Sequence, residues 1–243
     1  MTWRSVIYSK ATLALLLLFN SAQLWAGAVI GRIQLSGSRN AIVNKRKDFS
    51  GVVVWLTSSE NSTPHFARKH VQMIQKDKSF TPHILPIQIG TTVDFPNFDP
   101  IFHNAFSNFD GQIFDIGLYP PGSSRSIRFT TPGIVQVFCN IHPSMSAIIV
   151  VVDSSYFTTT DQLGNYSFAD VAPGAYQVHF FHERATAQTL AQLTQRIVVN
   201  DEPRELAAIT ISEAGYLPVA HKNKYGRDYP AGSDADGYSV PIR

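Results

Sequence analysis

Phe138-Cys139-Asn140-Ile141-His142-Pro143-Ser144-Met145 is the stretch from which fold and chemistry can both be inferred. It contains the only cysteine of the 243-residue chain, with His142 three residues later and Met145 three residues after that. A thiolate, an imidazole and a thioether are the soft, mixed donors that copper prefers, and a Cys-His-His plane with a long axial Met makes a blue-copper site. One ligand is missing from the stretch, and His103 is the best upstream candidate.

The residues around this stretch predict two strands joined by a tight loop. Residues 134–139 alternate as a strand does after the turn at residues 131–133, so the Cys139 sulfur should point inward together with two valines. Pro143 interrupts the chain before Met145, which indicates a loop rather than a helix. A second strand should start at residue 147, with side chains that are apolar on both faces.

At these residues the chain resembles the cupredoxins, the small blue-copper proteins. The short Cys-x-x-His-x-x-Met loop looks most like amicyanin, and the wider pattern adds Phe80-Thr81-Pro82, residues 89–97 and His103-Asn104. The resemblance covers about residues 70–152. Such chains are often labelled methylamine-utilisation proteins, a label that does not establish a pathway.

The resemblance implies a plastocyanin-like site with one type 1 copper. Its ligands would be His103, Cys139, His142 and Met145. Asn104 would tie the two ligand loops together from outside the ligand set. The electron-transfer surface would be formed by His142, Pro143 and Ser144.

The first 26 residues predict a signal peptide. Arg4 and Lys10 supply positive charge, and residues 11–19 form an apolar run too short to span a bilayer. We therefore expect an exported, soluble protein in a Gram-negative periplasm. A single thiol in an oxidising compartment needs protection, which bound copper would supply.

The composition is that of a globular protein and excludes several partners. Hydrophobic residues make up 44% of the chain and charged residues 16%. The formal net charge is +2, and removal of the signal lowers 20 basic residues to 18, equal to the 18 acidic residues. A near-neutral surface argues against nucleic-acid binding, and no later apolar run reaches the length for membrane insertion.

Short strands separated by Gly and Pro turns predict an all-β chain. The fold class we expect is a Greek-key cupredoxin β-sandwich or barrel plus a small β-sandwich that resembles transthyretin-like, carboxypeptidase-regulatory domains. Residues 28–60 and 153–212 would build this accessory sandwich, with the copper domain, residues 70–152, inserted between them. Alternatively, residues 28–57 add strands to the copper domain itself. Residues 213–243 should form an extended or disordered tail.

Three classes of function are compatible with these residues to different degrees. The leading hypothesis is a one-electron carrier, working between protein redox partners such as a donor dehydrogenase and an acceptor cytochrome. An enzyme is disfavoured, because the chain has no His-x-His pair for a second copper and no second cysteine, and because Cys139 and His142 are poorly spaced as a nucleophile and base. A copper carrier or sensor, or a binding module with a degenerate metal site, stays open as the alternative.

Overall fold

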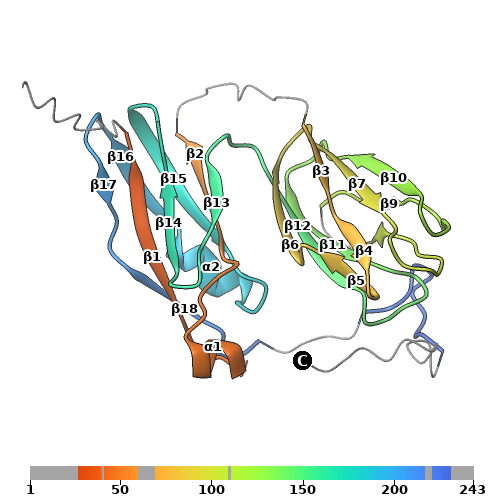
Figure 1. The fold of residues 1–243 in the computed structure, drawn as a ribbon. Coiled ribbons are helices and arrows are strands. Elements are labelled where there is room, and N and C mark those ends of the chain that lie inside the picture. Colours follow the sequence, from red (N-terminus) through yellow and green to blue (C-terminus); the bar gives the residue numbers. More distant parts are fainter. Residues whose placement is uncertain (1–26, 40, 60–68, 109–110, 217–220, 231–243) are drawn as a thin grey trace, which may run out of the picture.

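The computed structural model describes residues 27–39, 41–59, 69–108, 111–216 and 221–230. Nearly all of its regular elements are strands, which confirms the predicted all-β class. They form two lobes that lie side by side (Figure 1). The predicted signal peptide, residues 1–26, lies outside the described residues. No helix in the described residues is long and apolar enough to cross a membrane.

The first lobe, here called the accessory sandwich, packs two four-stranded sheets face to face. Every second side chain of β1 is buried, so each sheet gives one apolar face to the common core. One sheet contains β1 (Val29–Ser36), β14 (Asn165–Phe168), β17 (Arg204–Glu205) and β18 (Ile209–Ser212). The other contains β2 (Val53–Ser58), β13 (Phe157–Thr159), β15 (Gly174–Phe181) and β16 (Gln195–Val199). Two short helices accompany them, α1 (Ala41–Arg46) and α2 (Ala187–Leu193).

The turn before β14 contains Asp161 and Gly164, and its geometry requires both residues. Asp161 accepts hydrogen bonds from the backbone N–H groups of Leu163 and Asn165 through its Oδ1 atom. Gly164 has a φ of +82°, and a Cβ there would lie 1.9 Å from the carbonyl oxygen of Ile33 in β1. Only glycine allows this close approach, which lets the turn pack against β1.

Strands from both ends of the sandwich sequence pair directly. β1 runs antiparallel to β14, and β2 lies between β13 and β15, with Trp55 opposite both Phe157 and His179. In the described residues, neither β1 nor β2 pairs with a strand of residues 70–152. These are the pairings that the predicted insertion of residues 70–152 requires, and the division of the chain into domains stays a prediction.

The second lobe, here called the metal lobe, is built from residues 70–152 and contains three sheets. Strands β10 (Ser124–Arg128), β7 (Thr92–Pro96) and β3 (His70–Gln72) form one sheet. A second contains, in order, β6 (Ile84–Gln88), β12 (Ser146–Val152), β11 (Gly133–Phe138), β8 (Phe106–Ser107) and β9 (Phe114–Asp115). The hairpin of β4 (Ile74–Lys76) and β5 (Ser79–Thr81) completes the lobe.

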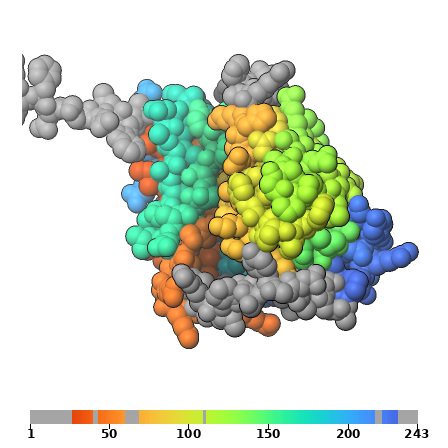
Figure 2. All heavy atoms as spheres, turned by 45° about the vertical axis from the view of Figure 1, so that its right-hand side comes forward, coloured from red at the N-terminus to blue at the C-terminus, as the bar shows by residue number. Residues whose placement is uncertain are grey.

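Side chains on the two faces of strand β12 are buried in two different cores, as its sequence, apolar on both faces, predicts. Ile149 and Val151 lie in the core of the metal lobe. Val150 and Val152 point the other way and form a buried cluster with Val53 of the accessory sandwich. Figure 2 shows the two lobes in contact. Apolar burial on both faces of one strand therefore holds the lobes together.

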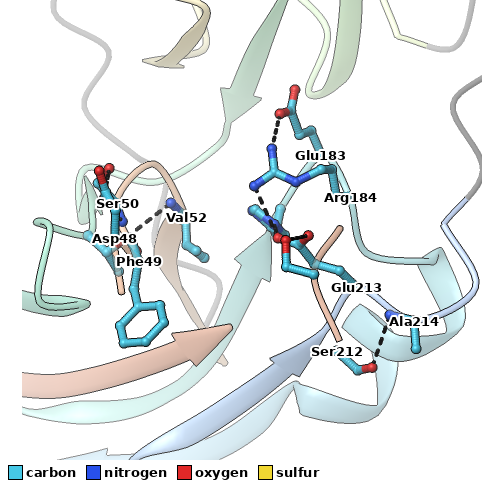
Figure 3. Close-up of polar contacts among 12 residues, drawn as sticks. Asp48, Phe49, Ser50, Val52, Glu183, Arg184, Ser212, Glu213 and Ala214 are labelled. Atoms are coloured by element: carbon cyan, nitrogen blue, oxygen red, sulfur yellow. Dashed lines mark hydrogen bonds and ion pairs between the residues drawn. The ribbon is translucent and has the colours of Figure 1, made fainter. Parts of the chain in front are cut away.

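A chain of charged side chains also crosses between the lobes. His83, just before β6, places its Nε2 atom 2.6 Å from Oε2 of Glu183 in the accessory sandwich. Arg184 bridges Glu183 and Glu213 at 2.6 and 3.0 Å (Figure 3). The hydrogen bond to Glu183 raises the pKa of His83, and the same bond lowers the pKa of Glu183.

Candidate metal centre

The loop between β11 and β12 is held closed by its own backbone. These strands pair in register up to Phe138 opposite Ser146, so residues 139–145 bridge a tight hairpin. The N–H of Cys139 donates to the carbonyl of Met145 at 3.2 Å, and the N–H of Met145 donates to the carbonyl of His142 at 3.0 Å. The loop is therefore rigid at its base.

Strand alternation places the thiol inside, as predicted. Val135, Val137 and Cys139 are all fully buried in the core of the metal lobe. Met145 is also fully buried and belongs to the same core. Its role as a fourth, axial ligand stays a prediction.

His103 reaches the site from a separate loop. Its backbone makes an isolated antiparallel bridge with Tyr119, with N–H to carbonyl distances of 3.2 and 2.9 Å. Tyr119 is itself buried, and its hydroxyl donates to the carbonyl of Phe95 at 2.9 Å. This bridge fixes the backbone from which the His103 ring projects.

Three of the four predicted ligands converge on one point. The Nδ1 atoms of His103 and His142 lie 3.1 Å apart, and the Cys139 sulfur lies 3.9 and 3.6 Å from them. Metal bonds of about 2.0 Å to nitrogen and 2.3 Å to sulfur would give a trigonal plane with edges of about 3.5–3.8 Å. The donor triangle therefore fits a metal ion bound by one sulfur and two nitrogens.

The chemistry of these donors points to a soft or borderline metal. All three residues are buried, His142 with 3% of its surface exposed. Thiolate and imidazole donors suit copper and zinc, whereas magnesium and calcium prefer oxygen. In the described residues this is the one group of three or more such side chains that is arranged to hold a metal.

Asn104 forms side-chain hydrogen bonds between the loop of His103 and the loop of Cys139. Its Oδ1 atom accepts from the N–H of Asn140 at 2.8 Å, and its Nδ2 atom donates to Asp115 at 2.8 Å. The side chain is 1% exposed. It thus links the loop of His103 to the loop of Cys139 without touching the donor atoms.

Sequence reasoning missed Asp99, which contacts a predicted ligand. Its Oδ2 atom lies 2.7 Å from Nε2 of His103. Burial alone would raise the pKa of Asp99, but hydrogen bonds from the N–H of Lys78, from His103 and from the N–H of Asp77 bring that pKa below its ordinary value. Burial, together with the nearby charge of Lys78, lowers the pKa of His103 by more than the hydrogen bond and charge of Asp99 raise it.

Sequence reasoning also missed the position of the tail. Residues 221–230, in blue in Figure 2, lie on the metal lobe. His221 stacks on Phe138 with ring centroids 4.0 Å apart and places Nε2 2.7 Å from the carbonyl oxygen of Pro143. The Tyr229 hydroxyl donates to the carbonyl of Cys139 at 2.8 Å. The predicted electron-transfer surface at Pro143 is thus in contact with the tail.

No family model and no curated protein matches the sequence, but solved structures overlap part of it. The copper-containing nitrite reductase of Thermus scotoductus is 32% identical over 34% of this chain, which spans 22% of that protein, with a TM-score of 0.33. A purple cupredoxin from Nitrosopumilus maritimus is 27% identical over 30% of this chain and 81% of its own, with a TM-score of 0.29. A reduced variant of amicyanin is 19% identical over 40% of this chain and 98% of its own, with a TM-score of 0.33. These TM-scores are low, and the function is inferred below from the geometry of the site alone.

Proposed function

We propose that this protein is a type 1 copper protein that carries single electrons between protein redox partners. The observation that supports the proposal is the buried triangle of one thiol and two imidazole nitrogens from His103, Cys139 and His142. Copper, when bound there, would supply the one-electron couple. The residues of the chain would supply the metal-binding atoms and hold them in a fixed arrangement.

Each ligand has a distinct task in this proposal. Cys139 binds as the thiolate, while His103 and His142 bind through the Nδ1 atoms that face it. Met145 would supply the fourth and weakest donor, a thioether sulfur. The closed loop and the bridge to Tyr119 hold the donors in one arrangement, so little rearranges when an electron arrives or leaves.

We propose a carrier rather than an enzyme, with export to the periplasm by the signal peptide of residues 1–26. One mononuclear site accepts one electron at a time. The nitrite reductase of Thermus scotoductus is a copper enzyme, but this chain spans only 22% of it. A donor dehydrogenase and an acceptor cytochrome are the proposed classes of partner.

Retention of copper separates an electron carrier from a carrier of copper. The full chain, loaded with one equivalent of copper, would be incubated with a chelator in the oxidised and then in the reduced state. We expect slow loss of copper in both states and full recovery of the oxidised form after a reduction cycle. Rapid loss in either state would favour a copper carrier or sensor and contradict the electron carrier.

A further inference from the structure

Asp99 and His103 form a buried hydrogen bond in which one partner is a carboxylate. The two side chains are 2% and 0% exposed, and the Nε2–Oδ2 distance is 2.7 Å. Because the carboxylate can only accept, the imidazole donates its proton from Nε2. The Nδ1 atom then carries a lone pair, and this is the atom that faces Cys139 and His142.

The turn between β4 and β5 is shaped around the Asp99 carboxylate. The N–H groups of Asp77 and Lys78 donate to its two oxygens at 2.6 and 2.9 Å. Both turn residues have positive φ, 53° and 51°, although neither is glycine. A type I′ turn, the favoured two-residue hairpin loop, takes positive φ at both of its central residues. Here they aim two amide dipoles at one anion, as backbone anion sites do.

The loop that contains Asp99 is fixed as well. Asn97 accepts from the N–H of Asp99 at 3.0 Å through Oδ1 and donates to the carbonyl of Ile101 at 2.8 Å. Asn97 is fully buried. Asp99 is therefore held by Asp77, Lys78 and Asn97, and it also bonds His103.

We propose that Asp99 is a positioning residue that fixes the tautomer of His103 and lowers the reduction potential of the site. The inference rests on the proposed function, because it concerns the same copper. A carboxylate bonded to a ligand histidine orients the ring and makes its other nitrogen more basic. A buried negative charge also stabilises the more highly charged copper(II) state relative to copper(I).

Neutralising Asp99 tests the effect on potential. Asp99→Asn should weaken binding of copper(II) relative to copper(I) by 10- to 100-fold, the range typical of such partners. At 59 mV per tenfold for one electron, the potential should rise by about 60–120 mV. Asp94→Asn is the matched control, because Asp94 lies in the same lobe and bonds Ser126 and His70. Equal potentials for Asp99→Asn and the wild type would overturn the proposal.

The tautomer is measured without copper and without a variant. In nitrogen-15 NMR spectra of the metal-free wild type, His103 should carry its proton on Nε2, and that proton should exchange slowly with water. A proton on Nδ1 would overturn the proposal, even if Asp99→Asn fails to fold. This measurement does not depend on the proposed function, which fails separately if the wild type holds no copper.

Discussion

At the scale of single residues, we predict that Asn104 stabilises the fold without contributing a metal ligand. Asn104→Ala removes the acceptor for the N–H of Asn140 and the donor to Asp115. A partly buried N–H left without a partner costs about 1–3 kcal/mol. We expect the free energy of unfolding of the metal-free protein, measured by urea denaturation, to fall by about that amount.

Asn108→Ala is the control for this prediction, because Asn108 is an exposed asparagine four residues further along the same segment. Its effect should stay within about 0.5 kcal/mol, as for most surface substitutions. Equal losses for the two variants would show that Asn104 does not link the loops.

Single residues also show what sequence could reveal about the site. The proximity of the Cys139 thiol and the His142 imidazole was predictable, because the two residues are three apart on one tight loop. Asp99 lies only four residues before His103, but the orientation of its carboxylate was not predictable, because it depends on the distant turn at residues 77 and 78. No local pattern records such a contact.

At the scale of elements, the tail segment 221–230 is the feature with the most direct consequence for the site. The loop between β11 and β12 is contacted by His221, Lys224 and Tyr229, and Lys224 also bonds Asp115. The segment has no hydrophobic periodicity, so sequence predicted only that it would be extended or disordered. By contrast, period-two alternation predicted β11 to within one residue.

Loosening the tail should make the copper more accessible. Tyr229→Phe removes the hydrogen bond to the Cys139 carbonyl. Losing about 1 kcal/mol there would raise the open fraction of the tail roughly fivefold. The rate at which a chelator extracts copper should rise by the same factor.

Tyr225→Phe serves as the control for the tail, because Tyr225 is 70% exposed and lies in the same segment. It should leave the extraction rate unchanged. If Tyr229→Phe also leaves the rate unchanged, the tail does not limit access to the site.

At the scale of the whole molecule, the two lobes are joined by an apolar cluster and by the contact between His83 and Glu183. The raised pKa of His83 means that this contact stabilises the fold below the unfolded histidine pKa of 6.5 and is lost as pH rises through the folded value. The lowered pKa of Glu183 means that its contribution is lost as pH falls through the folded value. The contact should therefore matter most between about pH 5 and 6.5.

His83→Gln should lower the free energy of unfolding by about 0.2–1 kcal/mol near pH 5.5, because the His83 side chain is half exposed. The loss should shrink toward zero near pH 8. Urea denaturation at several pH values measures it, and a cycle with Glu183→Gln isolates the coupling between the two side chains. A loss that is constant from pH 5 to 8 would contradict this account.

One copper held by His103, Cys139 and His142 through a thiolate should give the protein a strong colour. The most direct test is the visible absorption spectrum of the full chain with one equivalent of copper(II). We predict an intense thiolate-to-copper charge-transfer band that bleaches on reduction, returns on reoxidation and is absent from Cys139→Ser. A wild-type protein that binds one copper(II) yet stays nearly colourless would contradict the claim.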